Sequence, residues 1–178
     1  LGGNDAFIVL EDADLDAAAE HGVFGRVYNS GQVCTSPKRI IVVKAVAEAF
    51  IARAKTICES LKVGDPFEAD TQVQPMSSEA QLKTVLEQLE ANLKAGAKLV
   101  CGGKRIDRPG WFMEPTLLVD MQPGMPAYTE EVFGPVVCIY VVADEAAAVA
   151  MANDSRYGLG GTVFSADEAR AVNVARQI

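Results

Sequence analysis

Cys34 is the residue of this sequence best suited to nucleophilic chemistry. It lies in the segment GQVCTSPKR, residues 31–39, between a glycine-containing turn and an apolar run that starts at Ile40. A nucleophilic cysteine needs an accessible position and surroundings that favour the thiolate. A turn offers backbone N–H groups that could hold the oxyanion formed by attack on a carbonyl, and Lys38 and Arg39 could add positive potential. The local residues alone leave a buried structural cysteine as an equal alternative.

The other cysteines and the single histidine are weaker candidates for this role. Cys58 lies in a helical apolar pattern, and Cys101 and Cys138 lie in strand-like apolar runs, so all three are expected to be small core side chains. No two cysteines have the C-x-x-C spacing of a zinc site, and we expect no metal. His21 lies thirteen residues before Cys34 on an expected helix that does not aim it at the turn. A Cys–His pair is therefore a remote alternative.

Two other segments carry polar and aromatic groups that could line a site. EEVFGP, residues 130–135, directly precedes an apolar run, and its carboxylates and ring could bind hydroxyl groups and a planar ligand. The alternative is a solvated acidic turn with Phe133 in the core. NDSRYGLGG, residues 153–161, is a helix end followed by a glycine-rich turn. Because it lacks the G-x-G-x-x-G spacing and follows no strand, it predicts a structural turn beside a pocket and no phosphate cradle.

Strands and helices are expected to alternate along the whole sequence and to position these segments. Strands are predicted at residues 6–10, 39–43, 97–101, 116–120, 135–142 and 160–165, and helices at 16–31 (capped by Asp12 or Asp14), 46–62, 78–96 (capped by Ser78), 144–153 and 166–178. This alternation favours one α/β domain with a mostly parallel sheet and helices on both faces.

Composition and charge exclude several classes of partner. The 178 residues are 49% hydrophobic and 22% charged, which is typical of a globular domain. The net charge of −8 repels phosphate backbones and anionic lipid, so neither nucleic acid nor a membrane surface is an expected partner. We see no apolar run of membrane-spanning length and no signal peptide, and we expect a cytoplasmic protein.

Taken together, these motifs resemble the aldehyde dehydrogenase superfamily. The match runs through the segments LGGNDAFIVLEDADLD, YNSGQVCTSPKR, GDP, EEVFGPVV and ANDSRYGLGGTVFS, and from the first to the last it spans essentially the whole sequence. The combination of GQVC with EEVFGP at this separation is the specific part of the match. In detail the sequence looks most like bacterial succinate-semialdehyde dehydrogenases, because KR follows the GQVC motif, Arg26 lies eight residues before the cysteine and the match ends in YGLGGTVFS.

The resemblance implies roles for individual residues. Cys34 matches the nucleophile, Glu131 matches the carboxylate that binds the nicotinamide ribose hydroxyls, and Phe133 matches the aromatic residue packed by the nicotinamide. The segment 153–158 matches a motif that shapes the far side of the site. The implied reaction is attack of the Cys34 thiolate on an aldehyde, with the oxyanion held by the Cys34 backbone N–H and an asparagine. Hydride then passes to NAD or NADP, and water activated by a glutamate releases the acid.

A substrate that carries a carboxylate, such as succinate semialdehyde, calls for an arginine in the pocket. Arg26 and Arg156 are the candidates for this contact. Some succinate-semialdehyde enzymes carry an arginine six residues before the nucleophile, where this sequence has Tyr28.

The resemblance also implies that residues 1–178 are the thiol-bearing catalytic domain of a longer protein. In the family, a glutamate base directly precedes the first LGG, and the Rossmann cofactor domain and the oxyanion asparagine lie further upstream. An arm that pairs subunits follows downstream, so the parent is expected to be a homo-oligomer and this fragment alone to be inactive. The alternatives are a non-catalytic binding or assembly module of the same fold and a thioester-forming acyltransferase. The second would leave Glu131 and Phe133 unexplained.

Overall fold

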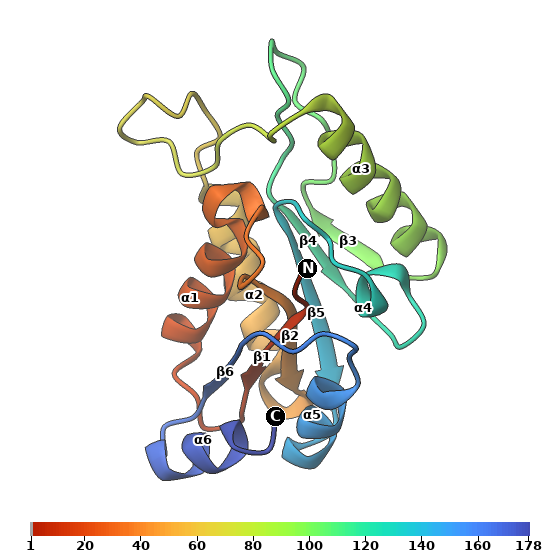
Figure 1. The fold of residues 1–178 in the computed structure, drawn as a ribbon. Helices are drawn as coiled ribbons and strands as arrows, with labels where there is room; N and C mark the ends of the chain where they lie inside the picture. The colour runs from red at the N-terminus through yellow and green to blue at the C-terminus, as the bar shows by residue number, and fades with distance from the viewer. Residues whose placement is uncertain (1) are drawn as a thin grey trace.

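The computed structural model describes residues 2–178 and contains one six-stranded sheet with helices on both faces (Figure 1). The strands are β1 (Asp5–Val9), β2 (Pro37–Val43), β3 (Lys98–Cys101), β4 (Thr116–Val119), β5 (Val136–Val142) and β6 (Gly161–Phe164). They lie in the order β3-β4-β5-β2-β1-β6. Only the edge pair β3–β4 of this sheet is antiparallel, so the predicted mostly parallel α/β fold is confirmed.

The helices are α1 (Leu15–Val27), α2 (Lys44–Ser60), α3 (Glu79–Lys94), α4 (Pro126–Thr129), α5 (Glu145–Asn153) and α6 (Glu168–Ala175), with a short 3₁₀ helix η1 (Tyr28–Gly31) after α1. Five of the helices lie where the sequence predicts them, although α1 ends four residues before the predicted end, and the short helix α4 was not predicted. Side-chain caps explain two of the starts: Asp14 accepts backbone N–H groups at the start of α1, and Ser78 does so at the start of α3. Within residues 2–178, no helix has the length and apolar character needed to cross a membrane.

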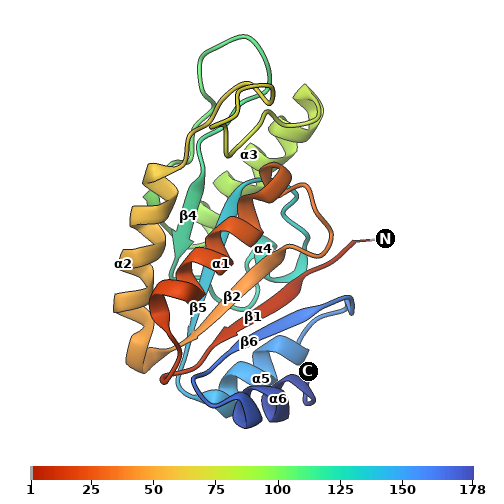
Figure 2. The same ribbon diagram turned by 90° about the vertical axis from the view of Figure 1, so that its left-hand side faces the viewer.

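Alternate residues of the central strands supply the two halves of the core. Phe7 of β1 pairs with Ile40 of β2, which pairs with Ile139 of β5, and this row packs against α1 and α2 on one face (Figure 2). Ile8 and its neighbour Ile41 point to the other face, where they join apolar residues from α3, α4, α5 and α6. The central strands are therefore buried on both sides, as their apolar runs indicate.

The segments singled out from the sequence meet at one edge of this sheet. Strands β1, β2, β5 and β6 are all parallel, so the segments that precede them lie at the same end. These segments are residues 2–4, 32–36, 130–135 and 154–160. The edge is the amino end of the strands, whereas ligands of open α/β sheets commonly bind at the carboxyl end.

Candidate active site

Cys34 is on the protein surface, in the turn between η1 and β2, and differs in this from the other cysteines. Cys58 and Cys138 are buried and Cys101 is partly buried. Burial raises the pKa of Cys138 to about 11, and a hydrogen bond with Cys101, together with burial, raises the pKa of Cys58. Neither of these two buried thiols therefore supplies a thiolate near neutral pH, whereas Cys34 is accessible to a reactant.

The backbone enters the Cys34 turn through three successive left-handed residues. The φ angles are 50° at Asn29, 56° at Ser30 and 72° at Gly31, and this conformation costs about 1–2 kcal/mol for a residue with a side chain. The Ser30 hydroxyl donates to the carbonyl of Gln74 at 2.5 Å, which helps to hold the turn. A methyl group on Gly31 would lie 2.1 Å from the carbonyl oxygen of Gly134, so the turn packs directly against the EEVFGP loop.

The ammonium of Lys38 links the Cys34 turn to the carboxylate of Glu131. Lys38 is 2% exposed, and its Nζ donates to the carbonyl oxygens of Val33 at 2.6 Å and of Cys34 at 2.7 Å. The same Nζ lies 3.0 Å from Oε1 of Glu131. Burial lowers the pKa of Lys38, and the hydrogen bond to Glu131 opposes that change. Lys38 is thus a buried cation shared by both motifs.

Arg26 forms a second, fully buried link between the same two segments. Its side chain is 0% exposed. On the turn side it donates to the Gly31 carbonyl at 3.1 Å and to the Ser36 hydroxyl at 2.9 Å; on the loop side it donates to the carbonyls of Val132 and Val136. Burial lowers its pKa to about 10, which leaves the guanidinium charged at neutral pH. This geometry corrects the expected contact between Arg26 and a substrate carboxylate, because the guanidinium is enclosed and bound to backbone and hydroxyl oxygens.

Gly2 and Gly3 run between Cys34 and Glu131 and touch both. The Gly3 N–H donates to Oε1 of Glu131 at 3.2 Å. A methyl group on Gly3 would lie 2.2 Å from the carbonyl oxygen of Cys34, and one on Gly2 would lie 2.6 Å from Oε2 of Glu131. Sequence reasoning identified this pair only as part of a motif, although two adjacent glycines before a strand are a signal of close backbone approach.

Replacing Gly3 with alanine is expected to destabilise the protein by about 1–3 kcal/mol, because the added methyl must displace the backbone of the Cys34 turn. The same displacement should change the rate at which Cys34 reacts with iodoacetamide. Urea unfolding and mass spectrometry of the alkylated protein measure the two effects. The control is Gly25→Ala on α1, whose added methyl meets Pro37 at an ordinary 3.5 Å; an equal loss of stability in both variants would contradict the steric explanation.

Helix α3 holds the EEVFGP loop in place. Nε2 of Gln81 donates to the Phe133 carbonyl at 2.9 Å, and Nε2 of Gln88 donates to the Glu131 carbonyl at 3.2 Å. Glu130 is exposed, whereas the Glu131 side chain is 17% exposed and paired with Lys38. Phe133 is half-buried. The loop is therefore ordered by helix contacts and a buried cation, which distinguishes it from a solvated acidic turn.

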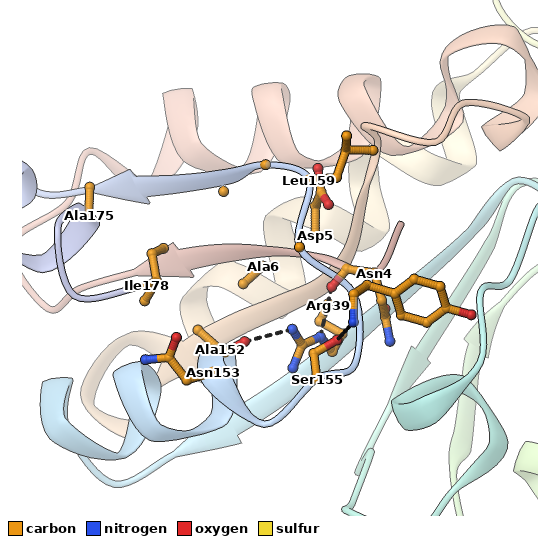
Figure 3. A pocket seen from close by; sticks show the side chains of 14 residues that line it. Asn4, Asp5, Ala6, Arg39, Ala152, Asn153, Ser155, Leu159, Ala175 and Ile178 are labelled. Carbon is orange, nitrogen blue, oxygen red and sulfur yellow. Dashed lines mark hydrogen bonds between the residues drawn. The ribbon is translucent and has the colours of Figure 1, made fainter. Parts of the chain in front are cut away.

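The side chain of Arg39 contacts the C-terminal end of α5 and, in the part of the chain that the structure describes, makes no hydrogen bond to the Cys34 turn. Its guanidinium donates to the carbonyls of Asn4 at 3.0 Å, Met151 at 2.6 Å and Ala152 at 2.9 Å, beside a cavity of about 460 Å³ (Figure 3). A cation is favoured there because the carbonyls at a helix C-terminus carry partial negative charge. Of the two cations expected to add potential at the thiol, only Lys38 hydrogen-bonds the turn.

The segment 153–158 reaches the site through Tyr157. The Tyr157 ring lies 3.5 Å from the position of a methyl on Gly2. Arg156 is exposed, its guanidinium lies 5.1 Å from the centre of the Tyr157 ring, and it donates to the Tyr157 hydroxyl at 3.2 Å. Within residues 2–178 it forms no ion pair with a carboxylate. Arg156 therefore remains open to an anionic ligand.

His21 lies beside β6 rather than at the Cys34 turn. It is exposed on α1, and its ring lies 6.0 Å from that of Phe164 on β6. Among the described residues, no hydrogen bond joins it to Cys34. The geometry therefore gives no support to a Cys–His pair.

Comparisons with known proteins agree with this arrangement. The profile of the aldehyde dehydrogenase family matches residues 1–178. A succinate-semialdehyde dehydrogenase [NADP(+)] of Deinococcus radiodurans is 44% identical over 100% of this chain and 37% of its own length. The succinic semialdehyde dehydrogenase structure from Streptococcus pyogenes, in complex with NADP+, shares 45% identity and a TM-score of 0.96 over 100% of this chain and 39% of that one. The Gox0499 structure shares 52% identity and a TM-score of 0.97 over 100% of this chain and 39% of that one. The chain, which spans 37–39% of these relatives' length, belongs to the aldehyde dehydrogenase family.

Proposed function

We propose that the whole protein containing this chain oxidises an aldehyde to a carboxylic acid with NAD+ or NADP+, and that Cys34 is the nucleophile. The observation that carries the proposal is an exposed thiol and a partly buried carboxylate, Glu131, at one edge of the sheet, joined by the buried ammonium of Lys38. The names of the relatives support succinate semialdehyde as the substrate.

The described residues fit a nicotinamide nucleotide at Glu131. Oε1 of this carboxylate is bound by Lys38 and Gly3, while Oε2 accepts no hydrogen bond from any described residue. Oε2 is therefore an acceptor for ribose hydroxyls, and a side chain on Gly2 would obstruct it. Phe133 presents a half-buried ring on the same loop for a planar group. When bound, the nicotinamide accepts a hydride from the substrate carbon.

Cys34 supplies the covalent chemistry in this proposal. Its thiolate sulfur bonds to the aldehyde carbon, and the carbonyl electron pair moves to the oxygen, where the backbone N–H of Cys34 donates a hydrogen bond. Return of that electron pair re-forms the carbonyl as the carbon loses its hydride, which leaves a thioester on Cys34. Water then cleaves the carbon–sulfur bond and releases the acid and the free thiol. The aldehyde, water and oxidised cofactor are consumed, and the acid, reduced cofactor and a proton are released.

A screen of aldehydes with NAD+ and with NADP+ on the whole protein tests this proposal, with Arg156→Ala as a probe of the substrate. We propose that Arg156 binds the substrate carboxylate, so its removal should raise KM for succinate semialdehyde about 10- to 100-fold, as expected for a lost hydrogen bond to a charged group. KM for pentanal, which lacks the carboxylate, should not change. The isolated 178-residue chain should produce no NAD(P)H. Equal KM changes for both aldehydes would contradict the role of Arg156, and no turnover of any aldehyde by the whole protein would contradict the function.

A further inference from the structure

The peptide bond between Val33 and Cys34 has a charged donor on its carbonyl side. Lys38 Nζ lies 2.6 Å from the Val33 oxygen. All peptide bonds among the described residues are trans, so the C=O of Val33 and the N–H of Cys34 point in opposite directions. A hydrogen bond on the carbonyl polarises the whole peptide unit and strengthens its N–H as a donor, and an ionised donor has the larger effect. The N–H of Cys34 is the group that faces the oxyanion in the proposed reaction.

The same ammonium has two more acceptors. It donates to the Cys34 carbonyl at 2.7 Å, which fixes the peptide unit on the other side of the nucleophile, and it lies 3.0 Å from Oε1 of Glu131. An ammonium has three N–H donors, so these three acceptors use all of them. At 2% exposure, water does not compete for the contacts.

We propose that Lys38 is a positioning residue, which polarises the oxyanion-binding peptide at Cys34 and fixes the Glu131 carboxylate that receives the cofactor. The inference rests on the proposed function and adds a residue to it. Two parts of the reaction that lie about one hundred residues apart in the sequence, at 34 and 131, are thereby held by one buried charge.

The test uses the whole protein with Lys38→Met, which keeps the length of the side chain and removes its donors. kcat for the best aldehyde should fall about 10- to 100-fold, less than the 10²- to 10³-fold typical of deleting an oxyanion donor outright. Lys44→Met is the matched control, because Lys44 is exposed at the start of α2, just beyond the other end of β2, and kcat of this variant should not change. Lys38→Gln, which retains an N–H donor, should recover part of the loss and serves as the second variant if Lys38→Met does not fold.

Two measurements separate positioning from a general structural effect. Alkylation of Cys34 by iodoacetamide in the cofactor-free protein forms no oxyanion, so its rate should change less than about threefold in Lys38→Met. In a double-mutant cycle measured by calorimetry, Glu131→Gln should weaken NADP+ or NAD+ binding in the otherwise unsubstituted protein. In the Lys38→Met background the same substitution should weaken cofactor binding little further.

Alkylation that slows as much as turnover would overturn the polarisation of the peptide, and additive losses in the cycle would overturn the coupling to Glu131. If Lys38→Met kept the wild-type kcat while Cys34→Ala was inactive, the inference about Lys38 would be overturned and the proposed function would stand. Activity retained in Cys34→Ala would instead overturn the proposed function.

Discussion

Replacing Cys34 with alanine is expected to lower kcat for aldehyde oxidation by the whole protein at least about 10⁴-fold, because no other group forms the covalent adduct. The side chain is exposed, so the free energy of unfolding should change by no more than about 0.5 kcal/mol. The formation of NAD(P)H, followed by absorbance, measures the first effect, and urea unfolding measures the second.

The control for this experiment is Cys101→Ala, which removes a partly buried thiol on β3. This variant should retain a kcat within a few-fold of that of the unsubstituted protein. Turnover by Cys34→Ala above about a tenth of the parent value would rule out Cys34 as the nucleophile. A loss of the same size in both variants would point to a structural effect of removing any thiol.

Replacing Arg26 with methionine is expected to cost about 3–5 kcal/mol in the free energy of unfolding. The substitution removes a buried guanidinium and leaves four oxygens without their donor, on Gly31, Ser36, Val132 and Val136. A buried acceptor that loses its partner suffers its desolvation cost without compensation. Urea unfolding of the purified protein measures the loss.

Arg53→Met on α2 is the matched control, because Arg53 is 40% exposed and pairs with Asp16 on the surface. A surface ion pair contributes about 0–1 kcal/mol, so this variant should unfold almost as the parent does. If Arg26→Met cost less than about 1 kcal/mol, Arg26 would not be the main connection between the Cys34 turn and the EEVFGP loop.

The secondary structure could be predicted because its causes are local. The apolar periodicity around α2 and α3, the cap residues Asp14 and Ser78, and the apolar run of β5 each act over a few residues. The meeting of the motifs also follows from the sequence once the sheet is taken as parallel. Segments that precede parallel strands must lie at the same edge, which brings Cys34 and Glu131 together.

The connections between the motifs could not be predicted in the same way. Arg26 binds backbone carbonyls 106 and 110 residues away, and a backbone carbonyl leaves no signature in the sequence. An arginine on a helix near a nucleophile therefore suggested a substrate contact. For Lys38 and Arg39 a signal was present, because adjacent strand residues point to opposite faces, so only one of them could serve the turn. The role of Gly3 depends on a steric contact with the Cys34 carbonyl that only coordinates reveal.

The contact between Gly31 and the Gly134 carbonyl has a consequence for engineering. There is no room for a side chain at Gly31, and Arg26 hydrogen-bonds the backbone on both sides of the contact, at Gly31 and at Val132. A chimera that transplants residues 28–36 from a relative would therefore bring in a surface shaped for a different partner loop. The exchangeable unit for altering substrate range is the matched pair of residues 28–36 and 130–136, grafted together.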